Sequence, residues 1–222
     1  VAHLRAAGHD VAVLPGFHPD ACREADAVIC EWANEEAYEA AASGVCKRLV
    51  VRVRGFDVFG PLTTMQWGNV HALVYESPFI KQLVEERVPG LRGFRSHVLP
   101  SGIDLTKARF KERKAGPVVA MVARGVADKG YQLAWEWARS RPDIQLHAAL
   151  AHPEPRLLRY LEGSKPANVT MYPMVDTMPW LDEIDANFLL SASNWESFGY
   201  TIAEAMACGI KPLIHDTPGA MA

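Results

Sequence analysis

Two glutamates eight residues apart, Glu196 and Glu204, flank a short glycine-containing turn late in the sequence. Carboxylates at such positions can accept hydrogen bonds from ligand hydroxyl groups. The spacing alone says little, because two other glutamate pairs in the chain share it and fifteen glutamates produce about one such pair by chance. The sequence around the two residues must therefore carry the inference.

That surrounding sequence predicts a strand, a tight turn and a helix. The apolar run 187–190 is typical of a buried parallel strand, and Ser197 is a candidate N-cap residue for a helix that ends near Gly209. Glu196 then lies on the strand-to-helix loop, and Glu204 lies about two turns further along. In open α/β sheets ligands bind beyond the carboxyl ends of the strands, and helix N-termini attract anions. The arrangement suits an anionic diphosphate with sugar hydroxyls beside it.

The segment from Glu196 to Glu204 begins with Glu-Ser-Phe-Gly and continues into Glu-Ala-Met-Ala-Cys-Gly. It resembles the paired-glutamate segment of retaining GT-B glycosyltransferases of the "group 1" family. The resemblance is to glycosyltransferase family 4-like members. Two further segments resemble the same family in the same order. An apolar strand over 117–123 is followed by Arg124 and Lys129, and residues 98–104, which include Gly102, resemble its Ile-Pro-Asn-Gly-Ile-Asp segment.

The resemblance implies a role for each matching residue. Arg124 and Lys129 would grip the donor diphosphate, because a guanidinium and an ammonium neutralise it better together than either does alone. Glu196 would hold hydroxyls of the donor sugar, and Glu204 those of the ribose. Three residues at the turn, Phe198, Gly199 and Tyr200, complete the predicted donor site. Catalysis is assigned to Glu196, Arg124 and Lys129, in a transfer that retains the anomeric configuration.

The first half contributes candidates for an acceptor or cleft site. Arg54 and Asp57 follow a predicted strand and resemble the family's His-Gly-x-Asp segment, with arginine in place of histidine. This departure leaves open what Arg54 does. Gly102 is a third candidate for this role. Glu31 and Trp32 also end a predicted strand, and either a cleft lining or a solvent-facing loop explains them.

Alternating apolar runs and helical patterns predict the fold class: α/β, with the GT-B architecture of two Rossmann-like domains whose parallel sheets face a cleft. The predicted strands are 11–14, 27–30, 49–53, 70–75, 117–123, 144–150, 169–172, 187–190 and 211–215. The predicted domains are 1–105 on the acceptor side and 117–222 on the donor side, joined by a basic linker over 106–116. We expect the first strand of the first domain, and the end of the second, to be missing from this sequence.

The composition limits which kinds of partner the chain can be expected to bind. There are 23 basic and 26 acidic residues, a balance that argues against a nucleic-acid partner. No apolar run is long enough for a transmembrane span, whereas peripheral membrane contact stays open. Four scattered cysteines favour a cytoplasmic location. Peripheral association with the inner face of the membrane is compatible with that location.

No metal and no cofactor are expected, because the nucleotide-sugar is a co-substrate. The expected acceptor is a glycan, a lipid or a small molecule.

Two alternatives to a transferase remain. A sugar-nucleotide epimerase of the same fold would also bind a diphosphate between two Rossmann-like halves and would need no acceptor. A non-catalytic fragment that binds a nucleotide-sugar or another partner is the second alternative, because the missing segments could remove part of an acceptor site. Nothing in the sequence fixes the donor base, the sugar or the linkage.

Overall fold

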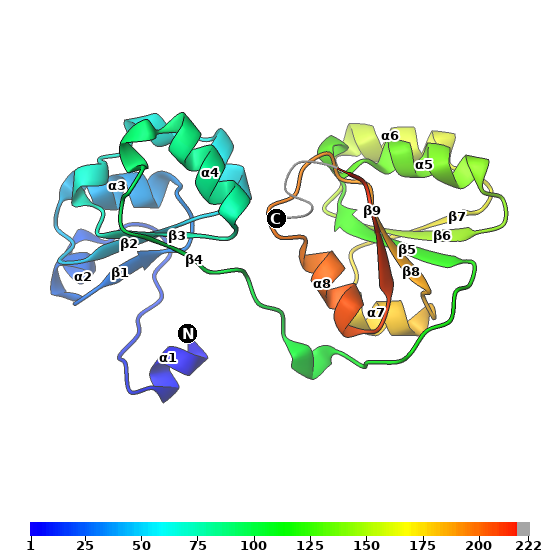
Figure 1. The fold of residues 1–222 in the computed structure, drawn as a ribbon, viewed down its shortest axis with the longest axis horizontal. Coiled ribbons are helices and arrows are strands. Elements are labelled where there is room, and N and C mark those ends of the chain that lie inside the picture. Colours follow the sequence, from blue (N-terminus) through cyan, green and yellow to red (C-terminus); the bar gives the residue numbers. More distant parts are fainter. Residues whose placement is uncertain (217–222) are drawn as a thin grey trace. The chain divides into compact units, whose positions relative to one another are not determined.

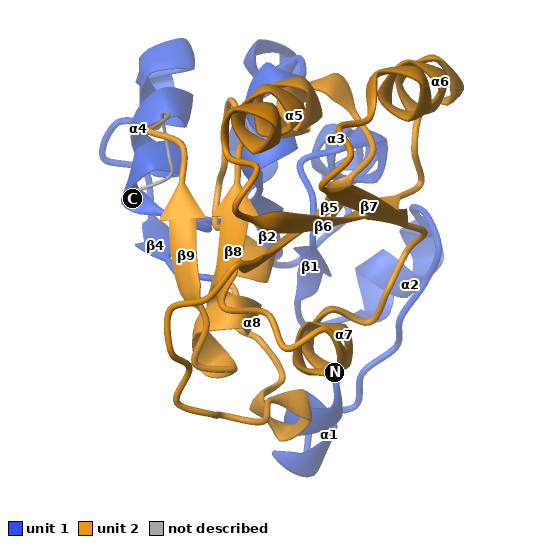
Figure 2. Ribbon diagram, turned by 90° about the vertical axis from the view of Figure 1, so that its right-hand side faces the viewer, with its two compact units in different colours: residues 1–100 blue, residues 101–222 orange. Residues whose placement is uncertain are grey.

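A computed structural model describes residues 1–216 and divides the chain into two compact units, Val1–Pro100 and Ser101–Ala222. Figure 2 colours the two units separately. The boundary falls after Pro100, so the predicted linker over 106–116 belongs to unit 2. Residues 217–222, the last part of the predicted donor domain 117–222, lie outside the described residues.

Unit 1 contains a parallel four-stranded sheet in the order β1-β2-β3-β4. Helices α3 and α4 cover one face of this sheet (Figure 1). The strands are β1 (Val28–Cys30), β2 (Leu49–Val53), β3 (Ala72–Tyr75) and β4 (Ser96–Val98), and the helices are α1 (Ala2–Ala6), α2 (Pro19–Glu24), α3 (Glu35–Ser43) and α4 (Pro78–Arg87). Local chemistry explains where α4 begins, because Ser77 Oγ accepts the Ile80 N–H at 3.2 Å and Pro78 occupies the first turn.

Two strand predictions for unit 1 were wrong. Residues 11–14 form no strand, although their apolar pattern predicts one. Val13 and Leu14 are exposed, and a strand needs a neighbour to satisfy its backbone groups. Strand β4 was missed because its three residues, Ser96–Val98, include a serine and a histidine and so lack an apolar pattern.

Unit 2 contains a parallel five-stranded sheet in the order β7-β6-β5-β8-β9. Its strands are β5 (Val118–Arg124), β6 (Gln145–Ala151), β7 (Val169–Tyr172), β8 (Phe188–Ser191) and β9 (Lys211–Ile214), and its helices are α5 (Tyr131–Ser140), α6 (Pro155–Ser164), α7 (Thr177–Glu183) and α8 (Tyr200–Ala207). The chain runs outward from β5 to β7, then returns to the other side of β5 through α7. Because the chain reverses its direction across the sheet here, the carboxyl ends of the neighbouring strands β5 and β8 form a topological switch point.

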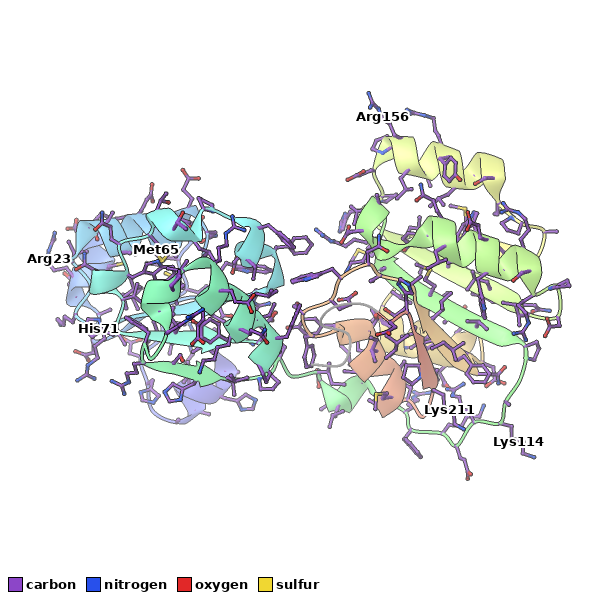
Figure 3. All side chains as sticks on the ribbon, turned by 45° about the horizontal axis from the view of Figure 1, so that its top comes forward. Arg23, Met65, His71, Lys114, Arg156 and Lys211 are labelled. Carbon is purple, nitrogen blue, oxygen red and sulfur yellow. The ribbon has the colours of Figure 1, made fainter. Side chains whose placement is uncertain are left out.

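Helices cover both faces of this second sheet. Figures 1 and 2 show α5 and α6 on one face and α7 and α8 on the other. Trp135 and Leu146 lie in the core under α5 and α6, and Leu181 and Leu189 lie in the core under α7 and α8. The charged surface lies outside these layers, where Arg156 projects from the start of α6 (Figure 3). The α/β fold with two parallel sheets is thus confirmed, whereas the predicted cleft between the sheets stays a prediction.

The segment 106–116 is fixed to unit 2 by Arg113. The Arg113 side chain is 2% exposed and donates to Asp182 at 2.9 Å and to Asp185 at 3.0 Å. Its Nε also donates to the Cys208 carbonyl at 3.4 Å. This arginine therefore joins the segment to the ends of α7 and α8.

Candidate functional site

Two loops follow the carboxyl ends of β5 and β8, the strands that flank the switch point of unit 2. The first loop, 125–130, carries Lys129, and the second, 192–199, carries Glu196. Because β5 and β8 are paired neighbours, their loops leave the same edge of the sheet side by side. The topology thus places the two candidate residues where open α/β sheets bind ligands.

Lys129 and Glu196 form an ion pair at this point. Lys129 Nζ donates to Glu196 Oε1 at 2.8 Å, and both side chains are largely buried. Ser193 Oγ donates to the same oxygen at 2.7 Å, and Ser193 is itself buried. Within residues 1–216 the second oxygen, Oε2, accepts no hydrogen bond. One oxygen of the carboxylate is therefore anchored, whereas the other has no hydrogen-bond donor among the described residues.

Backbone contacts hold the two loops together. The Asn194 N–H donates to the Asp128 carbonyl at 2.8 Å. Gly130 has a φ of +69°, and a Cβ at this position would collide with the Ala192 carbonyl oxygen. Only glycine fits both the left-handed conformation and this close approach. The geometry of the ion pair is thus set by the backbone as well as by the side chains.

Glu204 does not share the partners of Glu196. It lies on α8 rather than on the loop that carries Glu196. Burial raises the pKa of Glu204 above its usual value, while the nearby side chain of Thr177, the first residue of α7, opposes the rise. The two glutamates therefore lie in different surroundings. The ribose-binding role of Glu204 stays a prediction.

Helix α8 begins at Tyr200, with Gly199 as its N-cap in the left-handed conformation at a φ of +73°. The prediction that Ser197 is the N-cap was wrong, because the chain continues through Phe198 and Gly199 before the helix begins. Phe198 and Tyr200 stack edge to face, with ring centroids 5.0 Å apart. These three predicted donor-site residues thus form the entry to α8, next to the loop that carries Glu196.

The remaining predicted residues lie at several places. Arg124 is the last residue of β5 and is exposed. Gly102 is exposed near the start of unit 2. Arg54 and Asp57 follow β2 in unit 1, and Asp57 is 8% exposed, with a pKa raised by burial. Its Oδ2 accepts two backbone N–H groups, so Asp57 organises loops rather than facing solvent.

Sequence reasoning missed the contribution of Ser193. The signal was present, because Ser-x-x-Glu over 193–196 has the spacing of a reciprocal hydrogen-bonding box. That motif normally caps a helix, and here the serine binds the glutamate side chain directly in a loop.

Residues 1–216 contain no group of three histidine, cysteine, aspartate or glutamate side chains placed to hold a metal ion. None of the helices in this range is both long enough and apolar enough to cross a membrane.

The doubly wound parallel sheet defines an α/β protein, and Lys129 and Glu196 lie at the switch point where such sheets commonly bind ligands. Residues 103–222 match the family model described as "Glycosyl transferases group 1", and the chain belongs to this family. This match confirms the group 1 family expected from the sequence, whereas the family 4-like assignment and the retaining mechanism stay predictions. A search of curated protein sequences finds no match.

Solved structures share the fold at low sequence identity. A glycosyltransferase from Rickettsia africae matches with a TM-score of 0.69 at 15% identity, over 91% of this chain and 61% of its own. The pneumococcal O-GlcNAc transferase GtfA, solved with UDP and GlcNAc, matches with a TM-score of 0.62 at 15% identity, over 98% and 44%. Sucrose-phosphate synthase from Thermosynechococcus elongatus matches with a TM-score of 0.59 at 16% identity, over 78% and 51%. The chain thus spans 44% to 61% of the length of these proteins.

Proposed function

We propose that the chain is the donor-binding and part of the acceptor-binding region of a glycosyltransferase that uses a nucleotide-diphosphate sugar and retains the anomeric configuration. The observation that carries this proposal is the Glu196 carboxylate, which is anchored through Oε1 by Lys129 and Ser193 and open at Oε2. Membership of the group 1 family supports transfer over the epimerase alternative. The same-fold neighbour solved with UDP is consistent with a nucleotide donor.

Lys129 connects the two halves of the proposed donor. An ammonium group has three N–H donors, and the contact with Glu196 uses one of them. The other two can reach diphosphate oxygens while Oε2 of Glu196 accepts hydroxyls of the sugar. A single ion pair would thus bind the leaving group and the transferred group together.

The chemical step requires stabilisation of the diphosphate as it leaves an oxocarbenium-like sugar. Lys129 and Arg124 supply positive charge, and the N-terminus of α8 at Gly199 adds the partial charge of its backbone N–H groups. The contact with Glu196 already holds Lys129 in one position, so this charge would need little reorganisation during the reaction. Glu196 is engaged by Lys129 rather than facing a second carboxylate, which favours attack by the acceptor on the same face over a covalent glycosyl-enzyme.

The test is a screen of nucleotide-sugars with carbohydrate, lipid and small-molecule acceptors, read by mass spectrometry of the product. Proton NMR of the product then gives the configuration of the new linkage. A product with the donor's configuration supports the proposal, and an inverted linkage contradicts retention. An isomerised sugar formed without any acceptor would instead assign the chain to the epimerases.

A further inference from the structure

The carboxyl ends of three adjacent strands in unit 1 carry a cluster of charged and aromatic side chains. Glu31 and Trp32 follow β1, Arg54 and Asp57 follow β2, and Glu76 follows β3. Because β1, β2 and β3 are parallel neighbours, these residues leave the same edge of the sheet. None of them belongs to the donor site of unit 2.

Asp57 fixes the two loops that bear the cluster. Its Oδ2 accepts the N–H of Ala33 at 3.0 Å, in the loop after β1, and the N–H of Arg54 at 2.8 Å, directly after β2. A buried carboxylate with two backbone donors is held in one position. The backbone on both sides of the cluster is therefore preorganised.

Arg54 then holds Glu31 and Trp32 in place. Its Nη2 donates to Glu31 Oε2 at 3.0 Å and its Nε to the Glu31 carbonyl at 3.1 Å, while its guanidinium carbon lies 4.6 Å from the centroid of the Trp32 ring. On another side, Nη1 lies 3.9 Å from Glu76 Oε1. The Arg54 side chain is only 19% exposed. This arginine is a positioning residue.

The groups held by Arg54 remain accessible. The Glu31 side chain is 57% exposed, and its Oε1 accepts no hydrogen bond within residues 1–216. Trp32 is 41% exposed, and over the same range its indole N–H has no hydrogen-bond partner. An oriented carboxylate oxygen, an indole N–H and an aromatic surface thus lie side by side.

This combination fits a sugar ring. An aromatic surface packs against the C–H groups of a pyranose, and a carboxylate accepts strong hydrogen bonds from its hydroxyls. The cluster contains three carboxylates, those of Glu31, Asp57 and Glu76. They face two guanidiniums, that of Arg54 and that of Arg52, a residue of β2 that also pairs with Glu31. The excess of negative charge disfavours an anionic ligand.

We propose that Trp32 and Glu31 form a binding site for a neutral sugar ring, which belongs to a carbohydrate acceptor. The inference rests on the proposed glycosyltransferase function and narrows its acceptor from glycan, lipid or small molecule to a neutral glycan.

The test is saturation-transfer NMR on the full chain with neutral methyl glycosides of glucose, galactose and N-acetylglucosamine. The wild type should saturate the ring C–H protons of at least one glycoside. Binding should weaken about tenfold, or about 1.4 kcal/mol, in Trp32→Ala and in Glu31→Gln, which keeps the size of the side chain. Tyr160→Ala removes an aromatic side chain that is 53% exposed on α6, and this matched control should bind as the wild type does.

Two results would overturn the site: no binding of any glycoside, or unchanged binding in Trp32→Ala when circular dichroism shows a folded chain. Titration of the same samples with nucleoside diphosphates separates this inference from the proposed function. Glycoside binding that depends on Trp32, without nucleotide binding, would keep the carbohydrate site and reject the transferase. Nucleotide binding without glycoside binding would reject the carbohydrate site and keep the proposed transferase.

Discussion

Replacing Ser193 by alanine should weaken recognition of the donor sugar while leaving the diphosphate contacts in place. Ser193 Oγ donates to Glu196 Oε1 at 2.7 Å, and alanine removes this bond without adding bulk. Lys129 stays bound to the same oxygen at 2.8 Å. The carboxylate would then have one anchor instead of two, so Oε2 would no longer point in a fixed direction.

The expected loss follows from the type of bond. A hydrogen bond to a charged group contributes about 1.5–3 kcal/mol. Because Lys129 keeps Glu196 in the site, we expect the lower end, about 1.5 kcal/mol, which corresponds to about a tenfold loss in affinity or in kcat/KM. The loss should fall on the nucleotide-sugar, since Glu196 is proposed to contact sugar hydroxyls and Lys129 the diphosphate.

Titration calorimetry with a nucleotide-sugar and with its nucleoside diphosphate measures this difference directly. Ser193→Ala should lower the affinity for the nucleotide-sugar about tenfold and that for the diphosphate much less. Ser164→Ala is the matched control, because Ser164 ends α6 and its Oγ donates only to the Tyr160 carbonyl. Wild-type affinity for the nucleotide-sugar in Ser193→Ala would refute the anchoring role. An equal loss for both ligands would show instead that the loop itself had moved.

Three further predictions concern the framework around the site. Gly130→Ala should cost about 2 kcal/mol or more of stability, because the residue is left-handed and its Cβ would collide with the Ala192 carbonyl; a melting temperature equal to that of the wild type would show that the loops do not depend on this contact. Arg113→Ala should cost about 2 kcal/mol in urea unfolding, since it removes buried hydrogen bonds between the 106–116 segment and the ends of α7 and α8, and an unchanged midpoint would contradict this anchoring. Burial raises the pKa of Glu204 from 4.5, so the folded chain binds this proton more tightly than the unfolded chain and stability falls as the pH rises through the raised pKa. Glu204→Gln, which keeps the size of the side chain and removes its charge, should therefore gain melting temperature relative to the wild type from about pH 4 to about pH 7, and a constant difference would exclude burial of the charge as the cause.

Sequence patterns predicted most of unit 2, because helices cover both faces of its sheet and strands such as β5 read as continuous apolar runs. The predicted range 169–172 matches β7 at both ends. The run 11–14 has a similar apolar pattern, yet it is no strand, because pairing depends on neighbours that a local pattern does not specify. Strand β4 was not predicted, because it lacks an apolar pattern and yet pairs with β3 through its backbone.

For the candidate site, the sequence predicted which residues gather but not how they are connected. The βα order placed Lys129 and Glu196 at one sheet edge, as the structure shows. It did not reveal that Ser193 donates to the same Glu196 oxygen as Lys129, or that Glu204 is buried enough to raise its pKa. Such contacts depend on loop conformations and rotamers, which leave no periodic signal in the sequence. The roles of these residues in binding a donor stay predictions.

The central claim is that the Lys129–Glu196 pair at the β5/β8 switch point binds a nucleotide-sugar, Lys129 through the diphosphate and Glu196 through the sugar hydroxyls. Titration calorimetry of one nucleotide-sugar against the wild type and Lys129→Met tests it most directly. Methionine keeps most of the length of the side chain and removes its charge, so we expect measurable binding by the wild type and about 100-fold weaker binding by the variant, within the range for hydrogen bonds to charged groups. Equal affinities in the two proteins would contradict the claim.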